Sequence, residues 1–438
     1  MLAATHAAAS DPNLRLALRL LPALIVVLLA AAVCGRLALL LGQPRVLGEM
    51  VAGVLLGPTL FGALLPGTQA ALFPREVRPV LYVLSTLGLT LYMFLVGAGL
   101  DHQARVPGEG RRAVTLAASG ILPALLLGLG AGLLLWGRLS VPGVGRWEFA
   151  LFVGGALSLT AFPMLARILY ERGLHNSPLG RLSLLAASVD DAVVWCLLAV
   201  LTAMHYGSGS GGALLTIGLA ALFTAVMLGV VALPLRRLAR AGSLGATGMY
   251  VVILVPLVAG WFTDWIGVYT VFGGFVAGLA MPRDPAFRQA LHDRMLDVVT
   301  TLLLPVFFAF SGLNTHLDGI AGGFGLVAFL TILAAGFAGK YLGCSLSMRA
   351  LGFGWRESCA VGALMNARGL MILIFINIGL AQGMISRELF AMFVLVAVIT
   401  TASAVPLYRL ALPERHERSL ATESERVQPD DLTAVQAV

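Results

Sequence analysis

Long apolar stretches of about twenty residues alternate along the chain with short polar breaks that contain arginine. Apolar runs of this length are typical of α-helices that cross the hydrocarbon core of a bilayer. We therefore predict an all-α integral membrane protein with about thirteen transmembrane helices. The predicted spans are 16–35, 46–65, 79–100, 113–136, 148–170, 179–204, 213–235, 247–263, 266–281, 297–314, 321–348, 357–381 and 388–411.

The two ends of the chain differ from this pattern. Residues 414–438 are polar, which predicts a disordered tail after one transmembrane domain at 1–413. At the other end, Arg15 and Arg19 precede the apolar residues 20–33 in the way that a signal peptide begins. We favour an uncleaved first helix, and cleavage would leave twelve spans.

Composition excludes a soluble protein and a nucleic-acid partner. Hydrophobic residues make up 59% of the chain and charged residues 12%, about half the charged share of soluble domains. The net charge of +7 comes from arginines in the predicted loops, such as Arg236, Arg237 and Arg240. Most of them fall on one side of the bundle, which by the positive-inside rule is the cytoplasm and receives the C-terminus. The preference for arginine over lysine suggests a GC-rich bacterial genome, and so a bacterial inner membrane.

No pattern in the sequence indicates an enzyme. The 4 cysteines and 7 histidines lack the spacing of metal ligands or of a disulfide framework. The chain also lacks a hydrolase signature and a phosphate-binding glycine loop. We predict no catalytic residues and no cofactor.

Asp190 and Asp191 lie side by side within the predicted span 179–204. A carboxylate at the centre of a membrane helix costs about 2.5–3.5 kcal/mol on insertion scales, so two in succession indicate an ion or proton path. Neighbouring helical residues point ~100° apart, so the two carboxylates face different surroundings. One is expected to meet a basic partner and the other to face the ion path.

Lys340 is the only lysine among the 29 basic residues and lies within the predicted span 321–348. Arginine keeps its charge, whereas a desolvated lysine can release its proton near neutral pH. The position therefore indicates a titratable cation paired with Asp190 or Asp191. The alternative is a lysine at a helix end whose amine reaches the membrane surface.

A proline predicts an interruption in the span 148–170. Pro163 removes a backbone donor and clashes with the preceding turn, so the helix is expected to open near Ser158 and Thr160. Freed backbone carbonyls at such a break would be able to coordinate a cation.

The span 357–381 carries Asn366, Arg368 and Gly369 at a corresponding depth, and the triplet Gly-Ala-Leu occurs at both 155–157 and 362–364. Paired interruptions of this kind predict two inverted repeats with discontinuous helices that cross near the midplane of the bilayer. Arg368 would neutralise one half-helix end.

Small residues four apart predict close contacts between helices. These pairs are Gly53 and Gly57, Gly274 and Gly278, and Gly339 and Gly343. We interpret them as packing positions.

Six segments in order resemble the monovalent cation:proton antiporter-2 family of sodium/hydrogen exchanger-like proteins. They lie at 48–58, 158–167, 188–191, 272–279, 304–313 and 365–371. The resemblance implies a homodimer with elevator-like alternating access. It also implies that Asp191 is the carboxylate that binds the transported monovalent cation and the proton, and that Asp190 pairs with Lys340.

Two differences from relatives in this family are informative. Plant members often have a glutamate where this chain has Ile372, which leaves cation selectivity open. Potassium-efflux members with a cytoplasmic nucleotide-binding regulator match poorly, because the sequence after residue 413 is only a short polar segment.

We predict a secondary transporter that exchanges Na⁺, or alternatively K⁺ or Li⁺, for protons. The presence of both Asp190 and Lys340 favours electrogenic exchange. Three alternatives stay open, namely an electroneutral K⁺/H⁺ antiporter, a cation channel and a sodium-coupled organic-anion symporter.

Overall fold

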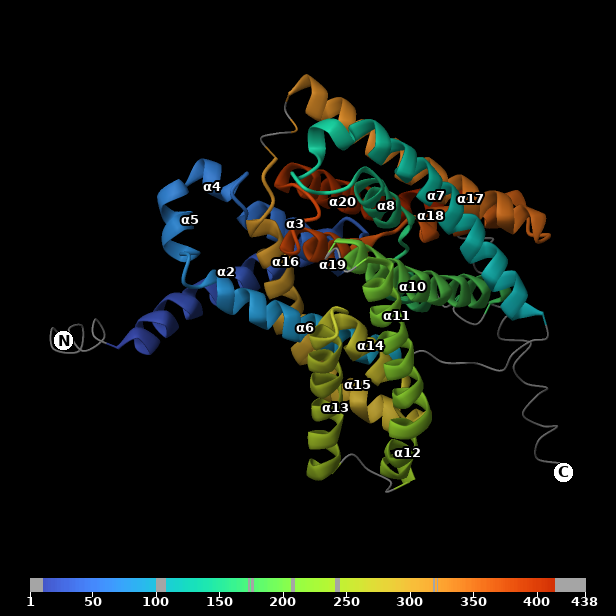
Figure 1. Cartoon of the computed structure of the whole chain (residues 1–438), viewed down its shortest axis with the longest axis horizontal. Helices are drawn as coiled ribbons and strands as arrows, with labels where there is room; N and C mark the ends of the chain where they lie inside the picture. Colours follow the sequence, from blue (N-terminus) through green and yellow to red (C-terminus); the bar gives the residue numbers. More distant parts are fainter. Residues whose placement is uncertain are drawn as a thin grey trace. The chain divides into compact units, whose positions relative to one another are not determined.

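The computed structural model describes residues 11–99, 108–171, 174, 177–205, 209–240, 245–317, 320 and 322–413, and these residues form helices joined by short connections (Figure 1). The predicted tail at 414–438 lies outside the described residues. The chain divides into two compact units, residues 1–102 with 202–316 and residues 103–201 with 317–438.

Unit 1 contains eleven helices and two π-helical turns in its described residues. They are α2 (Pro12–Leu40), α3 (Arg45–Leu56), α4 (Phe61–Leu64), α5 (Pro66–Leu72), α6 (Arg78–Gly99), α11 (Gly209–Val226), η1 (Met227–Val231), α12 (Ala232–Arg240), α13 (Ala246–Trp265), α14 (Thr270–Leu279), α15 (Pro285–Val298), η2 (Val299–Leu303) and α16 (Leu304–Leu313).

Unit 2 contains the helices that carry the predicted ionisable residues. They are α7 (Glu109–Leu139), α8 (Arg146–Ser158), α9 (Phe162–Glu171), α10 (Pro178–His205, to Leu201 within this unit), α17 (Gly323–Ala350), α18 (Trp355–Met365), α19 (Gly369–Ala381) and α20 (Arg387–Ala411).

The prediction of a helical membrane protein is confirmed. Twelve helical segments among the described residues are long and apolar enough to cross a membrane, one fewer than the thirteen predicted, because the predicted span 266–281 contains only the ten-residue helix α14. One span starts earlier than predicted, at Pro285 instead of 297. The charged residues of α15 hid this start from the hydropathy pattern, although Asp284 caps the helix by accepting a hydrogen bond from the Phe287 N–H at 2.8 Å.

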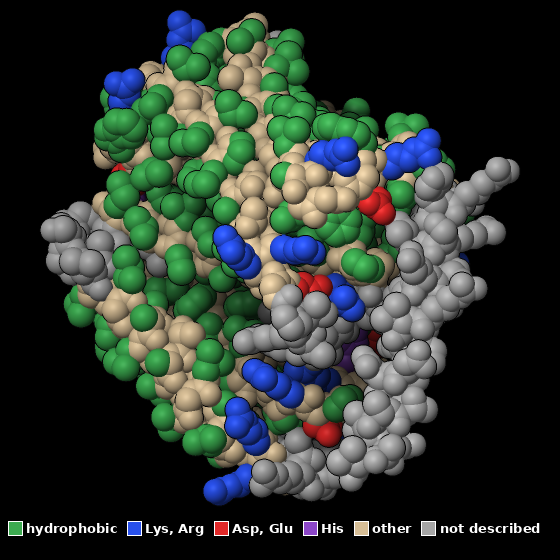
Figure 2. All heavy atoms as spheres, turned by 90° about the vertical axis from the view of Figure 1, so that its right-hand side faces the viewer, with side chains coloured by type: hydrophobic (Ala, Val, Ile, Leu, Met, Phe, Trp, Pro, Cys, Tyr) green, Lys and Arg blue, Asp and Glu red, His purple; other side chains and the backbone are tan. Residues whose placement is uncertain are grey.

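Apolar side chains are spread over much of the coloured surface in Figure 2. Leu40, Leu134 and Leu410 are each about 80% exposed in the isolated chain (80%, 81% and 78%). A soluble protein rarely exposes large contiguous apolar patches, whereas a lipid-facing surface requires them. The protein is therefore a multi-pass membrane protein.

The glycine pairs lie at close helix contacts, as predicted. A Cβ on Gly339 would lie 2.6 Å from the Ala124 Cα of α7, so α17 and α7 pack backbone against backbone (Figure 1). In unit 1 the first pair faces the backbone of α16, and the pair in α14 faces the backbone of α6. Small residues permit this spacing because a larger side chain would hold the helices apart.

Helix α2 packs on the rest of unit 1. Ala23 and Val27 of α2 are buried with Phe73, Val77 and Leu81 in one apolar cluster. The retention of this helix in the mature protein stays a prediction.

Two helices of unit 2 are interrupted. Helix α8 ends at Ser158, and α9 begins at Phe162. Pro163 is the second residue of α9, where its missing N–H leaves no intrahelical hydrogen bond unmade. Helix α18 ends at Met365, and α19 begins at Gly369, whose φ of +46° favours glycine over residues with a Cβ. Each interruption lies where the sequence pattern predicts a break.

Candidate functional site

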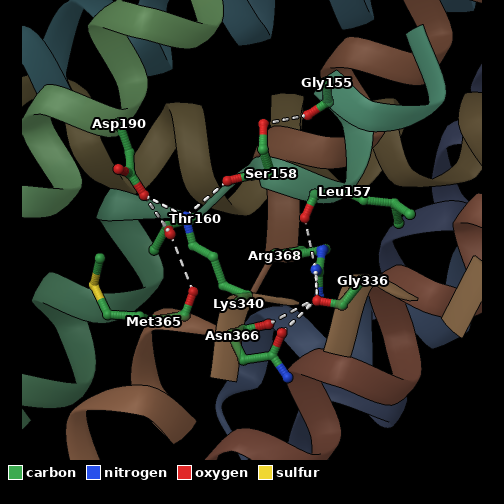
Figure 3. Close-up of polar contacts among 10 residues, drawn as sticks. All are labelled: Gly155, Leu157, Ser158, Thr160, Asp190, Gly336, Lys340, Met365, Asn366 and Arg368. Carbon is green, nitrogen blue, oxygen red and sulfur yellow. Dashed lines mark hydrogen bonds and ion pairs between the residues drawn. The ribbon is translucent and has the colours of Figure 1, made fainter. Parts of the chain in front are cut away.

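Lys340 and Asp190 form a fully buried ion pair in unit 2. The Lys340 amine on α17 donates to Asp190 Oδ2 on α10 at 2.5 Å, and neither side chain is exposed to solvent (Figure 3). The same amine donates to the Ser158 carbonyl at 2.7 Å. Lys340 thus joins a carboxylate to the carbonyl end of α8, which carries the negative end of the helix dipole.

Thr160 lies in the break between α8 and α9 and contacts both Asp190 and the second broken helix. Its hydroxyl is 2.7 Å from Asp190 Oδ2 and 3.0 Å from the Met365 carbonyl at the end of α18 (Figure 3). A hydroxyl has one proton, so it can donate to only one of these two acceptors at a time. The Thr160 hydroxyl can therefore donate either to Asp190 or to the Met365 carbonyl at the end of α18.

Arg368 lies in the second break and binds the end of α8, helix α17 and its neighbour Asn366. Its guanidinium donates to the Leu157 carbonyl at 2.8 Å, to the Gly336 carbonyl at 2.6 Å and to Asn366 Oδ1 at 2.8 Å (Figure 3). The side chain is completely buried, and its hydrogen-bond partners among the described residues are neutral oxygens, with no salt bridge to a carboxylate there. The fork geometry of arginine lets one cation serve three acceptors in different helices.

The two breaks also contact each other directly. The Ala161 N–H donates to the Ala367 carbonyl at 2.9 Å, which joins the residues of one break to those of the other. The Gly369 N–H at the start of α19 donates to the Thr401 hydroxyl of α20 at 2.9 Å. Backbone groups freed by the interruptions are thus satisfied inside the protein, as burial requires.

Asp191 is buried beside this network, with 1% of its side chain exposed. Its Oδ1 atom has no hydrogen-bond partner among the described residues, and the second oxygen of Asp190, Oδ1, also lacks one there. Burying an ionised carboxylate without a partner is costly unless a proton or a cation neutralises it. The two neighbouring acids therefore have different surroundings, because Asp190 is bound to Lys340 through its other oxygen and no such ion pair reaches Asp191 among the described residues.

The carbonyls that the sequence offered as cation ligands are largely occupied. Leu157, Ser158 and Met365 direct their carbonyl oxygens at Arg368, Lys340 and Thr160. Each of these acceptors already has a protein donor at 2.7 to 3.0 Å. These carbonyls therefore serve the protein's own donors in this structure.

Two predicted positions act through the backbone. The Ser158 hydroxyl donates to the Gly155 carbonyl of its own helix at 2.9 Å, so only its carbonyl takes part in the network. Pro163 is the second residue of α9, where it lacks a backbone N–H. Sequence reasoning missed Gly336 and Thr401, because a glycine and a threonine inside apolar helices give no signal of the distant backbone group that they meet.

Helices interrupted where buried acids, a lysine and an arginine meet are the architecture of secondary transporters. The family model described as "Sodium/hydrogen exchanger, transmembrane" matches residues 24–409. The chain therefore belongs to the sodium/hydrogen exchanger family, as the resemblance predicted.

Individual relatives agree with this assignment. The chain is 38% identical to the Na⁺/H⁺ antiporter NhaS4 of Synechocystis over 89% of this chain and 96% of that protein. It is 35% identical to Cation/H⁺ antiporter 18 of Arabidopsis thaliana over 88% of this chain, and 32% identical to K⁺/H⁺ antiporter 1 of Saccharomyces cerevisiae over 87%. The chain spans about half the length of these two longer relatives (48% and 46%).

A solved structure shares the fold. The sodium proton antiporter MjNhaP1 from Methanocaldococcus jannaschii matches with a TM-score of 0.62 over 91% of this chain and 97% of that chain. The sequence identity is 14%, so this likeness concerns the arrangement of helices alone.

Proposed function

We propose that the protein exchanges a monovalent cation for protons across a membrane, with Asp191 as the carboxylate that binds both. The observation that carries the proposal is the asymmetry of the acid pair. Lys340 offsets the charge of Asp190, whereas Asp191 Oδ1 is buried without a hydrogen-bond partner among the described residues. The family membership supports the same reading.

Coupling follows from competition at one carboxylate. A proton and a cation neutralise the same negative charge of Asp191, so the site holds one or the other but not both. A protein that exposes this site alternately to each side then exchanges the two species. Na⁺ is the favoured cation, as in the name of the Synechocystis relative, and K⁺ and Li⁺ are alternatives.

The remaining assignments rest on the sequence pattern and the family. We propose a homodimer in a bacterial inner membrane with its C-terminus in the cytoplasm, because the loop arginines concentrate on one side. The two broken helices, α8–α9 and α18–α19, are proposed as corresponding parts of two inverted repeats.

Other transport modes share some of these features. An electroneutral K⁺/H⁺ antiporter would use the same acids without net charge movement. A cation channel would not need a proton gradient, and a sodium-coupled organic-anion symporter would move its solutes in one direction. Flux that depends on an opposing proton gradient distinguishes antiport from the last two.

The test uses purified protein in proteoliposomes that contain a pH-sensitive dye. We expect external Na⁺, K⁺ or Li⁺ to drive proton movement in the wild type, and Asp191→Asn to abolish it. Asp264→Asn, the same substitution at an exposed carboxylate of α13, is the matched control and should retain exchange.

Two results would overturn the proposal. If none of the three cations moved protons, the antiporter assignment would fall. If Asp191→Asn exchanged like wild type, the site would fall. A clamped membrane potential separates the stoichiometries, since electrogenic exchange carries a current and electroneutral exchange does not.

A further inference from the structure

Gly120 of α7 lies directly against the side chain of Lys340. A Cβ built at Gly120 would be 3.4 Å from the Lys340 amine nitrogen and 3.5 Å from the adjoining Cε. The nearest atom, at 2.7 Å, would be the sulfur of Cys344, one turn after Lys340 on α17. Gly120, Lys340 and Cys344 are all buried.

These distances separate a clash from an ordinary contact. A methyl group 3.4 Å from the amine fits at van der Waals separation, whereas one 2.7 Å from a sulfur atom does not. The space that glycine leaves open beside Lys340 is therefore limited by the Cys344 side chain. Buried side chains are packed closely enough for one added carbon to displace its neighbours.

We propose that Gly120 and Cys344 share one packing volume that positions the Lys340 amine against Asp190. Both are positioning residues, since neither bonds to the acid. Side chains yield more readily than helix backbone, and the atoms nearest to a new methyl group at position 120 all belong to Cys344 and Lys340. An alanine there would consequently displace the Cys344 thiol and fill the space beside the amine.

The contacts of the amine make its position consequential for transport. It donates to Asp190 and to the Ser158 carbonyl, and Thr160 donates to the same carboxylate oxygen. Among the described residues, the titratable groups that interact with it are Asp190 and Asp191 from α10 and the Cys344 thiol from its own helix, and the charged Arg368 binds the adjacent Leu157 and Gly336 carbonyls. A more distant ammonium favours the two carboxylate anions less, by Coulomb's law.

The inference rests on the proposed function and predicts a rescue. Gly120→Ala is expected to slow cation-driven proton exchange by about fivefold or more. This is the size of effect expected when residues in direct contact are energetically coupled. The pH of half-maximal rate should rise by about half a unit, since a change of one unit corresponds to ~1.4 kcal/mol. Adding Cys344→Ala removes the clashing sulfur, so the double variant should recover both the rate and the pH profile.

The control is Gly132, a second glycine of α7 at a close contact between helices. A Cβ on Gly132 would lie 2.7 Å from the Ala150 Cα of α8, away from Lys340. Gly132→Ala is expected to lower the melting temperature, to leave the pH profile in place and to combine additively with Cys344→Ala. This control distinguishes helix packing from positioning of the amine.

The melting temperature of each variant provides a readout that does not require transport. The rescue of Gly120→Ala by Cys344→Ala should appear there as well. If wild type fails to exchange ions while the melting rescue holds, the proposed function falls and the shared volume stands. The inference is overturned if Gly120→Ala keeps the wild-type pH profile, or if the double variant is no better than Gly120→Ala alone.

Discussion

Gly336 and Lys340 lie one turn apart on α17 and hold the two broken helices from the same side. The Gly336 carbonyl accepts from Arg368 at 2.6 Å, and the Lys340 amine donates to the Ser158 carbonyl at 2.7 Å. A Cβ on Gly336 would lie 3.0 Å from the Arg368 guanidinium. Helix α17 therefore supplies one acceptor and one donor to a network whose other members lie on α10 and at or beside the two breaks.

The ion pair of Lys340 and Asp190 predicts a non-additive effect of mutation. Lys340→Met leaves a buried carboxylate without its cation, which costs about 3–5 kcal/mol in such pairs. Adding Asp190→Leu removes the unpaired charge, so the double variant should regain much of the lost stability. Thermal melting of the purified variants measures this. A double variant no more stable than Lys340→Met would contradict the expectation.

Arg368 should not tolerate lysine. Its guanidinium serves three oxygens in different segments, whereas an ammonium is a point charge that cannot reproduce this fork. Each buried acceptor left unsatisfied costs about 1–3 kcal/mol. We expect Arg368→Lys to lower the melting temperature and to abolish exchange.

Arg349→Lys is the matched control, because Arg349 is exposed on α17 and donates to the Phe353 carbonyl. It should melt and transport like wild type. Equal effects of the two substitutions would mean that the three acceptors of Arg368 do not depend on its fork.

Thr160 predicts a difference between two small substitutions. Thr160→Val keeps the shape of the side chain but removes the hydroxyl that donates to Asp190 or Met365, a loss of about 1.5–3 kcal/mol for a bond to a charged group. Thr160→Ser keeps that donor. Exchange rates in proteoliposomes should therefore fall for valine and stay close to wild type for serine. The reverse order would show that the methyl group matters more than the hydroxyl.

Alanine substitutions at Gly369 and Gly130 should shift the melting temperature in opposite directions. Gly369→Ala places a Cβ at φ +46°, 3.3 Å from the Ala161 Cβ, and left-handed backbone costs non-glycine residues about 1–2 kcal/mol. In Gly130→Ala of α7 the added Cβ meets nothing within 4 Å, and alanine favours the helix by about 1 kcal/mol. Melting temperatures should shift in opposite directions. A shift in the same direction would argue against strain at position 369.

Hydropathy predicted the helices well, because lipid imposes a length and an apolar composition that are local properties of the sequence. The thirteen predicted ranges each overlap helical residues, and the breaks at 158–162 and 365–369 were indicated by Pro163 and by the cluster around Arg368. The same cause explains why the span that begins at Pro285 was predicted to start later. The charged residues of α15 lower the local hydropathy, so a hydropathy criterion misses this part of the helix.

The contacts within the candidate site were harder to predict from the sequence. The residue pattern alone left open whether Lys340 would meet Asp190 or Asp191, because that choice depends on the rotation of α10 against α17, and only the family resemblance implied Asp190. Helix rotation is set by packing among segments far apart in the chain, such as Gly120 against Cys344. The same holds for Thr401, whose hydroxyl receives the Gly369 N–H across 32 residues.

The hydrogen bond from Ala161 to Ala367 has a mechanical consequence. Arg368 of the second break also donates to the Leu157 carbonyl at the end of α8, so two hydrogen bonds join the two interruptions. Neither broken helix can bend at its gap without tearing buried bonds from its counterpart. A hinge at either break would have to break these buried hydrogen bonds, so we expect the two interruptions to move together.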